Sequence, residues 1–341
     1  MNNQSQGVVT DKLNRPLRDL RISVTDRCNF RCPYCMPAAI FGEHYRFLPK
    51  QQILTYEEIA RLTRIIIRLG AVKLRLTGGE PLVRQDIDLL VRQLSGIDGA
   101  HDLAMTTNGV RLPGRAQKLK DAGLQRVTVS LDSLDNDVFR QMNGDRADVA
   151  DVMVGIDAAI AAGLTPIKIN AVVKRGVNDH TLLDLARWAK EQGYILRFIE
   201  YMDVGNRNGW RMEHVVPARE IAEIVDKALP LEPLPRNYNS ETALRFGYRD
   251  GGGELGIIAS VTMPFCGDCS RMRLSPDGHI YTCLFAIQGT DLMTPLRAGA
   301  TDDELETIIR DTWTNRTDRY SEVRSSDSAP TEKIEMYYIG G

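Results

Sequence analysis

The feature that most constrains the fold of this 341-residue chain is a regular alternation of short apolar strands with amphipathic helices. Six strand–helix units can be read between residues 20 and 202, and such repeats predict a parallel sheet covered by helices. Six units are too few to close the usual eight-stranded barrel. We therefore expect an α/β fold of the partial (βα)6 barrel type, with a doubly wound open sheet as the alternative.

The expected strands are Leu20–Thr25, Val72–Thr77, Asp102–Thr107, Arg126–Leu131, Ile167–Val173 and Ile195–Met202. The expected helices are Tyr56–Leu69, Asp86–Leu94, Pro113–Asp121, Val149–Ala162 and His180–Glu191. Thr55 and Glu58 predict a capping box at the start of the first helix, and a glycine stands just past four of the helices, at Gly70, Gly123, Gly163 and Gly193. Beyond residue 204 the alternation gives way to one more helix (217–228), a proline-rich stretch (230–235), short β-like pieces broken by glycine, and a helix at 302–315. This change predicts two domains, a barrel over residues 14–213 and a C-terminal α+β domain over residues 214–341.

The cysteines fall into two triplets, Cys28, Cys32, Cys35 and Cys266, Cys269, Cys283. The first, C-x3-C-x2-C, directly follows the first expected strand, and α/β barrels place their chemistry at the carboxyl ends of strands. Short runs of thiolates hold iron–sulfur clusters, and three thiolates leave one iron of a four-iron cluster open. For the second triplet, C-x2-C-x13-C, a zinc site with His279 as the fourth ligand is the alternative.

Cations are expected inside the barrel. Period-two alternation puts Lys73, Arg75 and Thr77 of the second strand on the face opposite its leucines, so these side chains should point inward. Other expected strands add further cations: Arg21, Lys168 and Arg197. Several cations in one lumen are costly without anions, which indicates a bound polyanion such as a triphosphate. Beside the second triplet, Arg271 and Arg273 share one strand face and suit a phosphate or a guanine edge.

The second strand ends in Gly78-Gly79-Glu80-Pro81. Glycines let a small group approach the backbone closely, and Glu80 offers a carboxylate to an ammonium group. The alternative is a βα turn that needs flexible residues. At the far end of the chain, Gly340-Gly341 has no side chains and could enter a narrow channel, with a conjugating tail of the ubiquitin-like kind as the alternative.

Composition limits the classes of partner. The net charge of −2 gives no general bias toward nucleic acids or anionic membranes. No apolar run approaches the ~18 residues of a transmembrane helix, and no secretory leader is evident. Paired cysteine triplets without a secretion signal favour metal centres in a reducing compartment over disulfides. We expect a cytoplasmic protein that binds neither nucleic acid nor membrane.

The first triplet and its preceding strand resemble the radical S-adenosylmethionine superfamily. Longer stretches are similar to one family within it, the GTP 3′,8-cyclases of molybdenum cofactor (molybdopterin) biosynthesis. They are DRCNFRCPYCMP (26–37), KLRLTGGEPLVR (73–84), MTTNG (105–109), VSLDS (129–133), KINAVVKRGVND (168–179), FIEYMDVG (198–205), CGDCSRMRLSPDG (266–278) and the terminal Gly-Gly. The resemblance spans nearly the whole chain and implies the partial barrel.

The resemblance implies a lyase that converts GTP into (8S)-3′,8-cyclo-7,8-dihydroguanosine 5′-triphosphate, the first step of the pathway. It implies two 4Fe–4S clusters and S-adenosyl-L-methionine as cofactors. The cluster on the first triplet would cleave S-adenosylmethionine to a 5′-deoxyadenosyl radical that takes hydrogen from C3′ of the ribose, after which C3′ bonds to C8 of guanine. The cluster on the second triplet would anchor the guanine.

The resemblance also assigns residues. Positions matched to S-adenosylmethionine are Tyr34, Gly79, Glu80, Ser130 and Met202. Positions matched to GTP are Arg21, Lys73, Arg75, Thr106, Lys168, Arg271 and Arg273. Positions expected to serve catalysis are Cys28, Cys32, Cys35, Arg271, Arg273, Gly340 and Gly341.

The expected partners are a reductant of unidentified kind and the next enzyme of the pathway, which takes the product. A homodimer is also compatible with the sequence.

Two other functions are alternatives to a GTP cyclase. One is another radical S-adenosylmethionine enzyme with an auxiliary cluster, such as a peptide maturase. The other is a non-catalytic regulator that binds zinc and a nucleotide.

Overall fold

One continuous sheet organises the protein. The computed structural model describes residues 8–324 and 332–341, and within them the twelve strands run in the order β12-β11-β10-β1-β2-β3-β4-β5-β6-β9-β8-β7. The strands of the six repeats lie side by side in chain order, each parallel to the next. They are β1 (Asp19–Ser23), β2 (Lys73–Thr77), β3 (Asp102–Thr107), β4 (Arg126–Ser130), β5 (Lys168–Val173) and β6 (Ile195–Glu200). Consecutive parallel order confirms the partial barrel and excludes the doubly wound sheet, whose strand order reverses.

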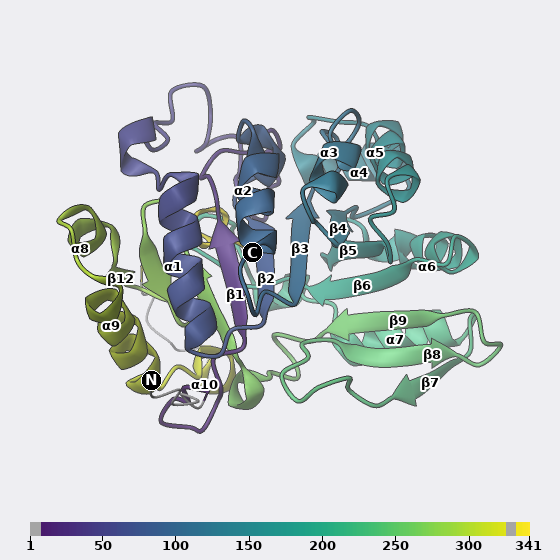
Figure 1. Ribbon diagram of the computed structural model, residues 1–341. Coiled ribbons are helices and arrows are strands. Elements are labelled where there is room, and N and C mark those ends of the chain that lie inside the picture. Colours follow the sequence, from purple (N-terminus) through teal and green to yellow (C-terminus); the bar gives the residue numbers. More distant parts are fainter. Residues whose placement is uncertain (1–7, 325–331) are drawn as a thin grey trace.

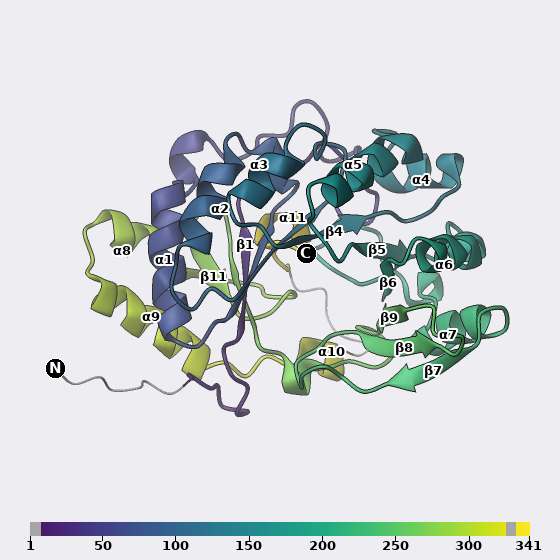
Figure 2. The same ribbon diagram turned by 45° about the vertical axis from the view of Figure 1, so that its right-hand side comes forward.

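Helices cover the outer face of these strands (Figures 1 and 2). They are α1 (Tyr56–Arg68), α2 (Ile87–Ser95), α3 (Ala116–Asp121), α4 (Asn136–Asn143), α5 (Val149–Ala161) and α6 (Leu182–Glu191). In α1 the buried side chains recur at helical spacing and include Ile59, Leu62 and Ile66, so one apolar stripe faces the sheet. Leu74 and Leu76 of β2 are buried against this layer. Packing of outward leucines against helices leaves the alternate positions of β2 to face inward.

The expected elements of the barrel are confirmed with small shifts at their ends, and α4 was missed. The capping box at the start of α1 is present, because Glu58 N donates to Thr55 Oγ1 at 3.2 Å and Thr55 N donates to Glu58 Oε2 at 2.7 Å. Helix α4 carries the same kind of signal. Asp135 Oδ1 accepts from the backbone N–H groups of Asp137 and Val138, and Gly144 ends the helix in the left-handed region.

Strands from the C-terminal part of the chain extend both edges of the barrel. β9 (Glu254–Ile258) pairs in parallel with β6, and β10 (Arg271–Leu274) pairs in parallel with β1. The antiparallel strands that follow outward are β8 (Leu244–Tyr248), β7 (Leu231–Leu234), β11 (His279–Tyr281) and β12 (Thr290–Asp291). An open barrel has two edges of unpaired backbone groups, and these strands satisfy both, so the sheet continues across the predicted domain boundary at residue 214.

The remaining helices close the structure around the sheet. They are α7 (Ala218–Asp226), α8 (Met293–Arg297), α9 (Asp302–Thr314), α10 (Tyr320–Val323) and α11 (Met336–Ile339). Helix α9 packs beside α1 on the outside, where Arg61 Nε lies 2.7 Å from Asp302 Oδ1 (Figure 1). Helix α11 instead lies against β1 on the inner side of the sheet (Figure 2). In the part of the chain that the structure describes, every helix is too short or too polar to span a lipid bilayer.

Candidate active site

The inner side of the curved sheet encloses a cavity of about 510 Å³. Its lining includes side chains from β1 to β6, from β10 and from both cysteine triplets, together with Gly341. Every site residue expected from the sequence lines this cavity except Gly340, whose carbonyl oxygen accepts a hydrogen bond from Arg273 Nη1. The structure therefore brings the expected residues together from positions up to 320 residues apart (Arg21 and Gly341), although their roles stay predictions.

The first triplet lies on a loop that its neighbours hold in a fixed shape. The backbone N–H groups of Cys35 and Met36 both donate to the carbonyl of Cys32, at 2.9 and 2.8 Å, and form a tight turn. Arg31 Nη1 donates to the carbonyl of Cys28 at 2.8 Å. Burial raises the pKa of the Cys28 thiol to about 12 and raises that of Cys32 as well. Without a metal these thiols stay protonated, so thiolates at this loop need the positive charge of a metal centre beside them.

The Gly78-Gly79-Glu80 turn packs against this loop. Gly79 N donates to Thr25 O at 2.8 Å, and a Cβ at Gly79 would lie 2.3 Å from the carbonyl oxygen of Arg27. Gly79 is thus required for close approach of the two loops. The buried Glu80 carboxylate accepts from Leu82 N at 3.0 Å, from the Thr107 hydroxyl at 2.7 Å and from Asn108 N at 2.8 Å. It ties the turn to the end of β3, and its contact with an ammonium group stays a prediction.

Asp132 joins Tyr34 on the cavity wall. The Tyr34 hydroxyl donates to Asp132 Oδ2 at 2.9 Å, and Val172 N donates to Oδ1 at 2.8 Å. Burial raises the pKa of Asp132 to about 7 even though both hydrogen bonds oppose the shift. The hydrogen bond to Asp132 fixes the ring of Tyr34, which lies between Cys32 and Cys35 in the sequence, close to the end of β4.

The second triplet lines the same cavity, on a loop whose backbone carbonyls bind two arginines. Arg15 Nη1 donates to the carbonyl of Cys266 at 2.8 Å, and Arg316 Nη1 donates to that of Cys269 at 2.6 Å. Both arginines are buried and both lie near the Asp11 carboxylate, at 2.6 Å from Arg15 Nε and 3.4 Å from Arg316 Nη1. The motifs in the sequence gave no signal for this support, because its members lie outside them and meet only in the folded chain.

Arg271 acts directly on a thiol of the second triplet. Its Nη2 lies 3.2 Å from Cys269 Sγ. Burial alone would raise the pKa of Cys269, but Arg271 and Arg316 outweigh it and lower the pKa to about 7. At Cys283 burial dominates instead and raises the pKa of the thiol to about 12. The loop therefore already favours one thiolate.

The described residues do not assemble the zinc site that His279 would complete. A tetrahedral zinc has its ligands at ~2.0–2.3 Å, so its thiolates must crowd round one point. Among residues 8–324 and 332–341, no three His, Cys, Asp or Glu side chains converge in that way. His279, the alternative zinc ligand, does not line the cavity, and its Nδ1 lies 3.0 Å from Asp277 Oδ2. In an iron–sulfur cluster each thiolate binds a different iron, so three cysteines without a fourth protein ligand fit a cluster with one iron open.

Three arginines form a row across neighbouring strands of the inner face. The strand register aligns Arg273 of β10 with Arg21 of β1, and Arg21 with Arg75 of β2. Neighbouring strands are about 4.8 Å apart, so like charges adjoin without a carboxylate between them. One step along, the register places Arg271, Asp19 and Lys73 in a second row.

Much of this positive charge has no hydrogen-bonding or ionic partner among the described residues. Four cavity-lining side chains form no hydrogen bond or ion pair within the described ranges: Arg21, Lys73, Lys168 and Arg197. Burial, and then the charges of Arg197, Arg126 and Arg75, lower the pKa of Lys168 to about 7. Burial and Arg271 lower the pKa of Arg273 to about 10. An anionic ligand would offset the cost of burying these cations next to one another, so the cavity suits the polyanion that the sequence predicts.

Tyr238 is a cavity residue that the sequence did not reveal. Its ring centroid lies 3.4 Å from Lys73 Nζ and 5.5 Å from the Arg18 guanidinium carbon. It belongs to the loop between β7 and β8, and Arg236 of this loop lies 2.8 Å from Asp268 of the second triplet's loop. A lone tyrosine outside any periodic element carries no signal of such a contact.

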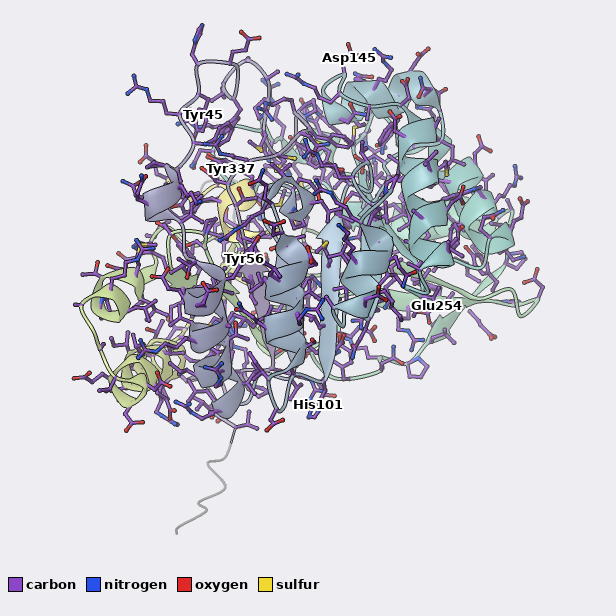
Figure 3. The ribbon with its side chains drawn as sticks, turned by 45° about the horizontal axis from the view of Figure 1, so that its top comes forward. Tyr45, Tyr56, His101, Asp145, Glu254 and Tyr337 are labelled. Atoms are coloured by element: carbon purple, nitrogen blue, oxygen red, sulfur yellow. The ribbon has the colours of Figure 1, made fainter. Side chains whose placement is uncertain are left out.

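The C-terminal residues enter the cavity from the side of the first triplet. Figure 3 shows Tyr337 of α11 below Tyr45, and the two hydroxyls are 2.7 Å apart. Tyr337 also packs edge to face on Phe41, at 4.9 Å between ring centroids. Beyond this anchor, Gly341 lines the cavity, and a Cβ at Gly340 would lie 2.1 Å from Thr77 Oγ1. Glycine is required there, as expected from a tail that occupies a narrow space.

Comparisons with known proteins agree with this site. Residues 22–189 match the Radical SAM superfamily, and residues 194–322 match Molybdenum Cofactor Synthesis C. The chain is 50% identical to a GTP 3′,8-cyclase of Acidothermus cellulolyticus, over 98% of this chain and 99% of that protein. It is 48% identical to a GTP 3′,8-cyclase of Xanthomonas campestris pv. campestris, over 99% and 98% of the two chains.

Solved structures show the same fold at low sequence identity. Streptococcus suis SuiB bound to S-adenosylmethionine superposes with a TM-score of 0.61 at 15% identity, over 93% of this chain and 71% of that one. SuiB bound to the precursor peptide SuiA gives 0.61 at 16% identity, over 93% and 70%. At such identity the likeness concerns the fold alone.

Proposed function

Because the chain belongs to the radical S-adenosylmethionine family of GTP 3′,8-cyclases, we propose that it converts GTP into (8S)-3′,8-cyclo-7,8-dihydroguanosine 5′-triphosphate, the first step of molybdenum cofactor biosynthesis. The observation that carries the proposal is a single cavity lined both by two cysteine triplets and by a row of arginines that faces no carboxylate among the described residues. The family uses S-adenosylmethionine with a 4Fe–4S cluster, and in this chain Cys28, Cys32 and Cys35 fit that cluster.

When bound, the first cluster and S-adenosylmethionine supply the one-electron chemistry that starts the reaction. The chain's own residues position the reactants. Tyr34, held by Asp132, and Gly79 lie beside the first triplet, and Ser130 and Met202 line the same cavity. We assign these four residues and the end of the cavity at the first triplet to S-adenosylmethionine. The phenol of Tyr34 stays neutral because burial raises its pKa, so it adds no negative charge next to the thiolates.

We assign the other side of the cavity to GTP. The row of Arg273, Arg21 and Arg75 would hold the triphosphate, with Lys73 and Lys168 completing the set of cations. Thr106 supports this row, because its hydroxyl accepts from Arg75 Nη1 at 3.1 Å. Binding in a buried pocket also excludes water from the reacting ribose.

A second 4Fe–4S cluster on Cys266, Cys269 and Cys283 is part of the proposal. The contact of Arg271 with Cys269 Sγ and the low pKa of that thiol support thiolate ligation there. Three thiolates would leave one iron free to meet the guanine. We further propose cytoplasmic location, an external reductant, release of the product to the next enzyme of the pathway, and the division of the chain at residue 214.

The test is anaerobic reconstitution followed by metal analysis, GTP binding and turnover. Two clusters predict about eight irons per chain, and substitution of Cys283 by Ser should lower the iron content toward four while leaving cleavage of S-adenosylmethionine. Reconstituted protein should bind GTP and, with reductant, yield 5′-deoxyadenosine and a cyclised GTP derivative. Protein that holds iron and cleaves S-adenosylmethionine but does not bind GTP would favour a maturase of peptides instead.

A further inference from the structure

The turn after β6, residues 203–208, holds the C-terminal tail several residues before its terminal glycines. Asn206 pairs with the backbone of Lys333 in both directions: Lys333 N donates to Asn206 Oδ1 at 2.9 Å, and Asn206 Nδ2 donates to Lys333 O at 2.6 Å. Asn206 N donates to Glu335 Oε1 at 3.1 Å. A two-point amide pairing of this kind fixes the tail in one register along the chain, since a shift by one residue would break both bonds.

A second contact anchors the Lys333 side chain. Its Nζ lies 2.8 Å from Asp203 Oδ2 and donates to the Asp203 carbonyl at 2.8 Å. Arg324 Nη2 lies 2.8 Å from Asp203 Oδ1, and the Tyr320 hydroxyl donates to Oδ2. Burial would raise the pKa of Asp203, but Lys333, Tyr320 and Arg324 outweigh it and hold the pKa below its usual value. The carboxylate of Asp203 therefore binds residues that precede and residues that follow the stretch 325–331, which the structure does not describe.

The backbone of the turn is shaped to receive the tail. Gly205 has φ +64, and a Cβ there would lie 2.1 Å from Glu335 Oε2. The tail is also held from the second triplet's side, where Ile334 N donates to Ala286 O at 2.8 Å. From Lys333 only seven residues lead to Gly340, whose carbonyl meets Arg273 in the cavity. The register set at Asn206 thus determines how far the glycines reach.

We propose that the turn at residues 203–208 is a receptor for the C-terminal tail, and that Asp203 and Asn206 are positioning residues that set where Gly340 and Gly341 lie in the cavity. The inference deepens the proposed function, because it rests on the tail being part of the site where GTP reacts. Met202 directly precedes the turn and lines the cavity, as does Val204 of the turn, and Asn208 Nδ2 donates to the Met202 carbonyl at 3.0 Å. The turn therefore contacts the tail and also adjoins the cavity.

Hydrogen exchange measured by mass spectrometry on the reconstituted full chain tests the receptor directly. In Asn206→Ala the peptide spanning residues 332–341 should exchange about tenfold faster, because the paired bonds at Lys333 are lost. Gly205→Ala should do the same through its collision with Glu335. Gly209→Ala is the matched control: Gly209 has a similar φ of +61, but nothing lies within 4 Å of an added Cβ. In a Glu335→Ala background, the effect of Gly205→Ala should shrink.

Turnover separates positioning from a merely structural role. Asn206→Ala and Gly205→Ala should form at least fivefold less cyclised product for each 5′-deoxyadenosine released, while cleavage of S-adenosylmethionine and iron content stay near those of Gly209→Ala. Unchanged exchange of the tail in both variants would overturn the receptor. A loosened tail with unchanged product per 5′-deoxyadenosine would overturn the positioning role. Wild-type protein that binds no GTP would contradict the proposed function instead, and the exchange result would still decide whether the turn holds the tail.

Discussion

Replacement of Lys168 by Met should stabilise the protein while weakening its function. Lys168 is a cavity cation with no hydrogen bond or ion pair among the described residues, and its pKa is lowered to about 7. Near pH 7 the unfolded chain binds a proton there that the folded chain half loses. This difference in proton binding lowers the free energy of unfolding at pH 7 by at most about 4 kcal/mol. Partial exposure of the Lys168 side chain reduces the effect to roughly 2–4 kcal/mol. Met has a similar length and no charge, so Lys168→Met should regain this free energy.

The stability advantage of Lys168→Met over the wild type should depend on pH. Because the pKa of Lys168 is lower in the folded chain, the unfolded chain binds more protons above pH 7. The free energy of unfolding of the wild type therefore rises as the pH increases above 7. The advantage of Lys168→Met should therefore narrow by about 2 kcal/mol between pH 7 and pH 9. Denaturant unfolding of the cluster-free protein at both pH values measures it, with Lys168→Arg as a control that keeps the charge and gains no stability.

The functional effect should run in the opposite direction. Loss of a buried charge that pairs with phosphate should weaken GTP binding by tenfold or more, and binding to the wild type should weaken as pH rises above 7. Lys168→Arg should remove that pH dependence, which separates it from titration of the nucleotide. A Lys168→Met variant that is less stable than the wild type, or whose advantage is the same at both pH values, would refute the claim that this cation lacks a partner in the free protein.

Three further predictions concern other parts of the site and its support. Arg273→Ala should lower GTP turnover by about 10- to 100-fold while leaving uncoupled cleavage of S-adenosylmethionine largely intact; equal loss of both would place Arg273 in folding. Removal of Gly340 and Gly341 should abolish most cyclisation without shifting the unfolding midpoint, and a fully active truncation would show that the tail does not act in the site. Glu200→Gln should destabilise the protein by about 2–4 kcal/mol in denaturant unfolding, because the buried carboxylate accepts three backbone N–H groups, those of Ala218, Val261 and Thr262.

The barrel could be predicted because its signals are local. Alternation in β2, the capping box at Thr55 and the glycines after helices each act within a few residues, and each is present in the structure. Inward cations followed from the same alternation, since the leucines of β2 had to face the helices. The two cysteine triplets could also be recognised, because the members of each are close in sequence, and the structure places both on one cavity; their metal binding stays a prediction.

Long-range pairings could not be read in this way. Nothing local indicates that β10 joins the edge at β1 or that β9 joins the edge at β6, and these pairings complete the cation row by placing Arg273 beside Arg21. Two other contacts also join distant segments: the ion pairs of Asp11 with the arginines that bind the second triplet's loop, and the cation–π contact of Lys73 with Tyr238. Each depends on contacts between segments whose separate sequences favour no particular partner.

The central claim is that one cavity brings S-adenosylmethionine at the first triplet against the ribose of GTP held by the arginine row. Turnover of GTP carrying deuterium at C3′ tests it most directly, with mass spectrometry of the 5′-deoxyadenosine. One deuterium is expected to move into 5′-deoxyadenosine for each cyclised product formed. Release of 5′-deoxyadenosine without deuterium, at a rate that GTP does not change, would contradict it.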